Sequence, residues 1–92
     1  MRPLQQFNLH APNNMNFRKD VILDLISRTE KCTVSEILDA CSYLRLGSQA
    51  TIHRELQEII GSKFIKTSLC RKDGRIRYLR ASALGKRYIE RL

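Results

Sequence analysis

The residues best suited to chemistry in this chain are cations gathered toward its C-terminal end. Arg71, Lys72 and Arg75 lie close together, and Arg77 follows two positions later. Guanidinium and ammonium groups bind phosphate oxygens through charge-assisted hydrogen bonds, so this cluster predicts contact with a polyanion. The plainer alternative is a charge run that only keeps the surface hydrated.

The cluster is part of an uneven distribution of charge along the chain. The net charge is +8, and the segment after residue 60 holds ten Lys and Arg against two Asp and Glu. Residues 17–60, by contrast, hold six basic and seven acidic residues. A uniformly basic protein would not show this asymmetry, which indicates one face suited to nucleic acid.

A turn signal lies inside the basic cluster. Asp73-Gly74 separates two strand-like runs at residues 64–70 and 75–79, and Asp-Gly favours a tight β-hairpin. In the second run, Ile76 and Tyr78 are predicted on one face, with Arg75 and Arg77 on the other. The pattern predicts a basic hairpin tip that clamps phosphates or probes a minor groove, with Asp73 near enough to hold Arg75.

A second candidate site is a predicted helix over residues 49–60. Ile52, Leu56 and Ile59 have the spacing of a buried stripe, which turns a polar arc outward. Glutamine can pair with adenine, arginine with guanine, and the methyl groups of Ala or Thr with thymine. The residues here that could reach DNA are Ser48, Gln49, Ala50, Thr51, His53, Arg54 and Gln57.

Taken alone, the pattern of this helix fits a solvated polar surface as well as it fits a helix that reads bases. Ser48 can cap the helix or bind a phosphate at its N-terminus. His53 lies at the margin of the apolar stripe, where packing is favoured over a DNA contact. Glu55 and Glu58 count against DNA binding, because carboxylates repel phosphate.

The remaining elements are predicted from apolar spacing and capping signals. Helices are expected over residues 17–28 and 34–44, and a last helix after Ser82, while residues 31–33 could add a short edge strand. Gly47 is expected to take the positive φ at the end of the second helix. The predicted fold is α+β, mainly α: a winged helix-turn-helix with three helices, a two-stranded β-hairpin wing and a C-terminal helix. Residues 17–92 form this domain, and residues 1–16 form a flexible N-terminal arm.

Two stretches of sequence are similar to known regulators. Residues 48–56 resemble the recognition helix of bacterial winged-helix repressors. Asp73-Gly74-Arg75, an alternating strand and then Ser82-Ala83-Leu84-Gly85 resemble the wing and following helix of the MarR family. The resemblance implies a DNA-binding transcriptional regulator with Arg75 in the minor groove, oriented by Asp73, and with Ser82 capping the last helix. The sequence lacks the long flanking helices of full-length members, which suggests a minimal winged helix.

The combined prediction is a sequence-specific regulator of transcription that binds double-stranded DNA and represses by occluding a promoter. A homodimer is expected, because one helix and one wing read only a few base pairs. Its interface would use either arm residues or the last helix; the candidates are Phe7, Leu9 and Met15, or Tyr88, Ile89 and Leu92. The alternative is a winged-helix protein–protein interaction module of a replication, recombination or transcription complex.

Other functions have little support in the sequence. There is no phosphate loop, His-Glu metal motif or nucleophile elbow, so neither an enzyme nor a cofactor is expected. Cys32, Cys41 and Cys70 are widely spaced, which predicts reduced thiols and no metal site. Without a secretory signal or a run of about 18 apolar residues, we expect a cytoplasmic protein with no membrane partner. A small-molecule effector is not expected.

Overall fold

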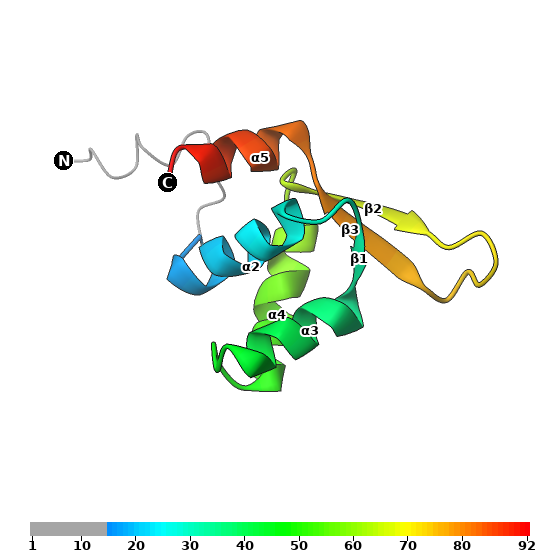
Figure 1. Cartoon of the computed structure of the whole chain (residues 1–92), viewed down its shortest axis with the longest axis horizontal. Helices are drawn as coiled ribbons and strands as arrows, with labels where there is room; N and C mark the ends of the chain where they lie inside the picture. Colours follow the sequence, from blue (N-terminus) through cyan, green and yellow to red (C-terminus); the bar gives the residue numbers. More distant parts are fainter. Residues whose placement is uncertain (1–14) are drawn as a thin grey trace.

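The computed structural model describes residues 15–92, so nearly all of the arm expected at residues 1–16 lies outside the described part. The expected winged helix-turn-helix architecture is confirmed: a helical body carries a β-hairpin that projects to one side (Figure 1). The helices are α2 (Phe17–Ser27), α3 (Val34–Tyr43), α4 (Gln49–Ile60) and α5 (Ala83–Glu90). The strands are β1 (Cys32–Thr33), β2 (Ile65–Leu69) and β3 (Arg77–Ala81).

Short polar side chains fix where each described helix begins. Each capping oxygen accepts a hydrogen bond from the backbone N–H three residues later; the caps are Asn16, Thr33, Ser48 and Ser82. Thr33 and Glu36 also form the expected capping box. Because such caps contribute about 1 kcal/mol each, local chemistry determines these helix starts.

The core forms where α2 passes between the other elements. Ile22, Leu23 and Ile26 of α2 have no exposed surface, and they pack with residues of α4 and β3. The predicted stripe of α4 is confirmed, since Ile52, Leu56 and Ile59 are all buried. This packing turns the opposite side of α4 to solvent.

The three described strands form one antiparallel sheet in the order β1-β3-β2. The short strand suggested by residues 31–33 is therefore present, and Cys32 pairs with Leu79. The hairpin differs from the prediction, because Leu69 pairs with Arg77 and the connection spans residues 70–76. Asp-Gly does not form a two-residue hairpin turn here. Instead, the N–H of Ile76 donates to the carbonyl of Asp73 (3.0 Å), closing a turn at the end of a longer loop.

The later start of β3 also overturns the predicted strand faces. Leu79 and Ala81 face the core, whereas Tyr78 and Arg80 lie on the outer face. Ile76 lies in the loop and does not share a strand face with Tyr78. Arg77 is on the same face of the sheet as Leu79, two residues away. It lies past the end of the core, so its side chain is exposed. The alternation was read over residues 75–79, of which the first two precede the strand.

The base of the hairpin is held by a close backbone contact. A Cβ atom on Gly85 would lie 2.4 Å from the carbonyl oxygen of Phe64, so only glycine fits without movement of the backbone. Ser82 donates its N–H to the same oxygen (2.9 Å) and its hydroxyl to the carbonyl of Lys63 (2.7 Å). We call Phe64, Ser82, Gly85 and Tyr88 the hairpin base.

Tyr88 joins the hairpin base to α2. Its ring packs against Phe64 with centroids 4.8 Å apart, and its hydroxyl donates to Oδ1 of Asp20 (2.8 Å). Burial and this hydrogen bond raise the pKa of Tyr88 to about 12. Tyr88 thus contributes to packing within the chain, and Leu92 beyond it is exposed.

Candidate nucleic-acid interface

The outward arc of α4 presents most of the side chains predicted to read bases. Five of these residues are exposed, namely Gln49, Ala50, His53, Arg54 and Gln57, while Thr51 is half-buried. The packing role favoured for His53 is wrong, because the core stripe passes beside it and leaves the imidazole in solvent. The helix therefore offers a continuous polar surface from its first turn.

The start of α4 uses the side chain of Ser48 as a cap. The N–H of Thr51 donates to Ser48 Oγ (3.2 Å), and the two hydroxyls lie 2.9 Å apart. In the turn before it, Arg45 has the positive φ (56°) that was expected of Gly47. Gly47 instead gives space to a neighbour, since a Cβ there would lie 3.3 Å from Nε of Arg18.

Glu55 is turned away from the outward arc and into the protein. Its side chain is 6% exposed, and Nη1 of Arg18 donates to both carboxylate oxygens (3.1 and 3.2 Å). Nδ2 of Asn16 adds a further hydrogen bond (3.3 Å). Arg18 also donates to the carbonyl of Leu46 (3.1 Å). The start of α2 thereby holds both α4 and the turn that precedes it.

Glu58 is likewise neutralised by α2. Its carboxylate forms an ion pair with Lys19, whose side chain is buried. The hydrogen bond from Lys19 lowers the pKa of Glu58, and the positive charge of nearby Arg54 adds to the effect. The expectation that Glu55 and Glu58 would repel phosphate is therefore corrected. Glu55 lies three residues after Ile52 and four before Ile59, and this spacing was the signal that the helix turns its side chain inward.

We call residues 70–77 the wing tip. Its cations are exposed, and the side chain of Arg75 is 92% exposed. Oδ1 of Asp73 accepts from Nε of Arg75 (3.2 Å) and from its backbone N–H (3.0 Å), as the sequence suggested. These bonds lower the pKa of Asp73, so the carboxylate stays charged and keeps hold of the guanidinium.

The predicted residues thus fall into two groups that the fold positions separately. One group follows the exposed arc of α4, and the other surrounds the wing tip at the end of the hairpin far from α5 (Figure 1). A third basic group was missed by the sequence reasoning; it lies around the outer face of β2 and β3 and comprises Lys31, Lys66, Arg80 and Lys86. These residues are scattered in the chain; the strand register pairs Lys66 with Arg80, and the turn before β1 and the first turn of α5 bring in Lys31 and Lys86.

The cysteines differ in their surroundings. Burial raises the pKa of Cys32 and Cys41, whereas backbone hydrogen bonds in the wing tip lower the pKa of Cys70. Over residues 15–92, no cluster of three His, Cys, Asp or Glu side chains could hold a metal ion. Within the same residues, no helix is both long and apolar enough to cross a membrane.

Comparison with known proteins identifies the fold. No family model matches the sequence, and neither does any curated protein. The structure is similar to Bordetella bronchiseptica BpsR (17% identity, TM-score 0.70, covering 96% of this chain and 61% of that one). It is also similar to the adhesin competence repressor AdcR of Streptococcus pyogenes (19%, 0.69, 96% and 63%). A third similar structure is a mutant of E. coli MarR complexed with operator DNA (14%, 0.69, 96% and 64%).

These similarities show that the chain has a winged helix-turn-helix fold. Its fold is MarR-like, as the resemblance in the wing and last helix predicted. The chain spans about three fifths of the length of the structures it matches.

Proposed function

We propose that this protein is a sequence-specific regulator of transcription that binds double-stranded DNA and represses a promoter by covering it. The observation that carries the proposal is the exposed Arg75 held by Asp73 at the tip of a basic hairpin. In this proposal, α4 lies in the major groove and the wing tip contacts the minor groove and phosphates. We also propose that the protein is not an enzyme.

The exposed arc of α4 has the chemistry to read base edges. Gln49 and Gln57 can each make paired hydrogen bonds to adenine, and Arg54 can do so to guanine. Because Glu55 is buried and Glu58 is paired with Lys19, the carboxylates of α4 do not oppose the approach of phosphate. The operator structure of the similar MarR protein supports a DNA partner for this fold.

The wing tip is suited to the narrow part of a minor groove. The enhanced negative potential there attracts arginine side chains. Arg75 is already oriented by Asp73, so less conformational freedom is lost on binding. Arg71 and Lys72 would contact the adjacent phosphates, fixing the register of the protein on the duplex.

We further propose that the regulator acts as a homodimer on a palindrome with half-sites roughly 34–36 Å apart. The outer side of α2 and α5 is the candidate interface. Phe17 and Leu92 are 76% and 70% exposed there, beside a shallow apolar groove that also includes Val21 and Ile89. A second copy of the chain would cover this surface.

The test is a salt series of binding to random-sequence duplex DNA, with Arg75→Ala and Arg87→Ala compared with wild type. Arg87 is an exposed cation on α5, so its replacement makes the same change in charge away from the wing tip. We expect the Arg75 variant to reduce the magnitude of the slope of log K against log salt by up to about 0.9, because a cation held in the minor groove displaces about one counterion. The Arg87 variant should keep the wild-type slope.

Two results would contradict the proposal. The first is no binding at roughly 50 mM salt, where nucleic-acid contacts are strong. The second is equal weakening by both substitutions, since DNA would then respond only to net charge. Either result would favour the protein-docking alternative. The expected result would justify selecting the preferred site from a random library.

A further inference from the structure

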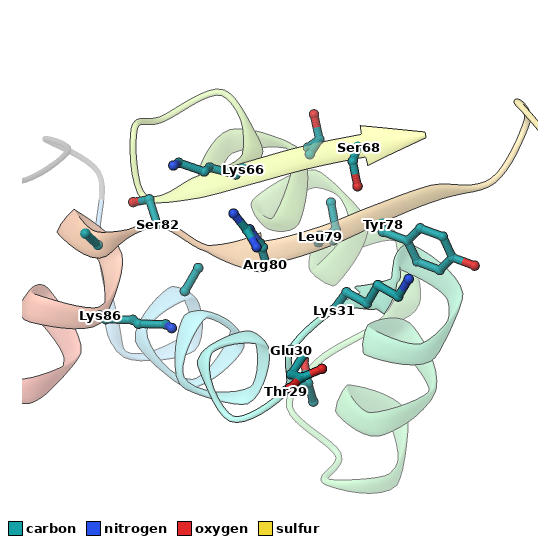
Figure 2. A pocket seen from close by; sticks show the side chains of 13 residues that line it. Thr29, Glu30, Lys31, Lys66, Ser68, Tyr78, Leu79, Arg80, Ser82 and Lys86 are labelled. Atoms are coloured by element: carbon teal, nitrogen blue, oxygen red, sulfur yellow. The ribbon is translucent and has the colours of Figure 1, made fainter. Parts of the chain in front are cut away.

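The outer face of the sheet carries a hollow that is separate from the DNA-binding surfaces proposed above (Figure 2). It lies over the outer face of β2 and β3 and is bordered by the turn at residues 29–31 and the first turn of α5. Its volume is about 800 Å³. The hollow is open on its solvent side, and its volume lies within the range of small-molecule sites.

Positive charge dominates the lining of this hollow. Cations reach it from three directions (Figure 2); they are Lys31 in the turn, Lys66 on β2, Arg80 on β3 and Lys86 on α5. The acidic lining residue is Glu30, which is exposed. Within residues 15–92, no ion pair joins any of these cations to a carboxylate.

The strand register places two of these cations against each other. Lys66 pairs directly with Arg80 across the antiparallel ladder, so both side chains rise from the same face. Like charges directly opposite one another destabilise a sheet. An anion between them would turn this repulsion into two attractive contacts. The pair of cations therefore lowers the stability of the sheet when the hollow is empty and raises it when an anion is bound.

The next residues along the strands complete the lining. Ser68 pairs with Tyr78 on the same outer face; Ser68 adds a hydroxyl group, whereas the hydroxyl of Tyr78 points away from the hollow (Figure 2). The ammonium group of Lys31 lies 4.6 Å from the centre of the Tyr78 ring, and this cation–π contact holds it at the edge of the hollow.

We propose that this hollow binds a small anion with more than one negative charge, of the phosphate or polycarboxylate kind. The guanidinium group of Arg80 can grip two oxygens at once, while Lys66 and Lys86 act as point charges. The hollow lies on the face of the sheet away from the core and behind the wing tip. Its occupancy does not depend on the DNA-binding proposal.

The test is a titration of the ¹⁵N-labelled full chain, followed by NMR, with pyrophosphate in one arm and citrate in the other. We expect saturable shifts centred on residues 29–31, 66–68 and 78–86. The double variant Lys66→Gln/Arg80→Gln should bind at least about tenfold more weakly, because two charge-assisted contacts are lost. The control, Arg71→Gln/Lys72→Gln, removes the same charge from the wing tip and should bind as wild type does. The stronger of the two probes identifies the anion class.

A thermal melt provides a second readout. Without anion, Lys66→Gln/Arg80→Gln should melt at a higher temperature than wild type, because the cross-strand repulsion is gone. Pyrophosphate should raise the melting temperature of wild type and leave that of the variant unchanged. A merely solvated charge cluster would not produce this reversal.

Three results would overturn the inference: shifts spread over α4 and the wing tip, equal weakening by both double variants, or no saturation by either probe up to several millimolar. Duplex binding by Lys66→Gln/Arg80→Gln is measured on the same samples. If DNA binding persists while anion binding is absent in wild type, only the anion site is wrong. Failure of DNA binding in wild type with anion binding intact would overturn the regulator proposal alone.

Discussion

The two ends of the β2–β3 hairpin are stabilised in different ways. At the hairpin base, Gly85 contacts the backbone of Phe64, and Ser82 bonds to the same segment. At the wing tip, the cations are exposed, and the ordered contact is the surface pair of Asp73 with Arg75. Buried contacts contribute most to stability, whereas exposed charge contributes to binding. Substitutions at the base should therefore affect folding, and those at the tip should affect binding.

The largest expected effect is at Gly85. In Gly85→Ala, the new methyl group would overlap the carbonyl of Phe64, and two backbone segments would have to separate. We expect a loss of about 2–4 kcal/mol in the free energy of unfolding, measured by urea denaturation. Gly74→Ala in the wing tip is the control, since a Cβ there meets nothing within 4 Å. Equal stability of the two variants would remove the proposed distinction between base and tip.

The second prediction concerns the ion pair that holds α4 against α2. It tests whether breaking this pair lowers the free energy of unfolding, as a substitution at the hairpin base should. Glu55→Gln weakens a pair whose carboxylate is 6% exposed but whose partner, Arg18, is 37% exposed. Because that arginine is partly screened by water, we expect a loss of about 1–2 kcal/mol. Asp24→Asn breaks an exposed pair with Arg28 and should cost no more than about 0.5 kcal/mol. Urea denaturation of both variants tests this. Equal losses would mean that the pair of Glu55 with Arg18 stabilises α4 no more than an exposed surface pair would.

The third prediction concerns Asp73 at the wing tip. Asp73→Asn makes the protein more positive, so net charge alone predicts tighter binding to any duplex. If Asp73 acts by orienting Arg75, the variant should bind its selected site several-fold more weakly and gain only on random DNA. Binding to both duplexes at one salt concentration decides between these effects. Tighter binding to both duplexes would show that Asp73 plays no part in orienting Arg75. The melting temperature of the variant should equal that of wild type in either case.

The elements themselves could largely be predicted from the sequence. Caps and apolar spacing depend on neighbouring residues, so α4 was located at its observed bounds and the start of α2 was predicted at Phe17. The Ser82-to-Gly85 pattern was read from resemblance, and the structure supplies its reason in the contact with Phe64.

Features set by distant residues could not be predicted in this way. The burial of Glu55 depends on Arg18 in another helix. The opposition of Lys66 and Arg80 depends on a register that the longer loop shifts relative to a two-residue turn. The candidate site was therefore found where its residues are adjacent in sequence, and the anion-binding hollow, which draws on separate elements, was missed.

The smallest expected effect returns to the hairpin base and concerns Tyr88. Its pKa is raised to about 12 in the folded chain, above the value of about 10 in an unfolded one. The folded state therefore favours the neutral phenol, and this stabilisation is complete below pH 10 and lost as the pH rises toward 12. Because the Tyr88 ring is only half-buried, we expect wild type to lose less than about 1 kcal/mol of unfolding free energy through Tyr88 between pH 9 and pH 11. Tyr88→Phe should lack that part of the decline, whereas Tyr43→Phe, at an 88% exposed position, should follow wild type. Urea denaturation at pH 9 and pH 11 measures the difference. A plot of unfolding free energy against pH for Tyr88→Phe that runs parallel to that of wild type would contradict this. It would mean that the bond to Asp20 does not hold α5 against α2. Packing with Phe64 alone would then join the hairpin base to the helical body.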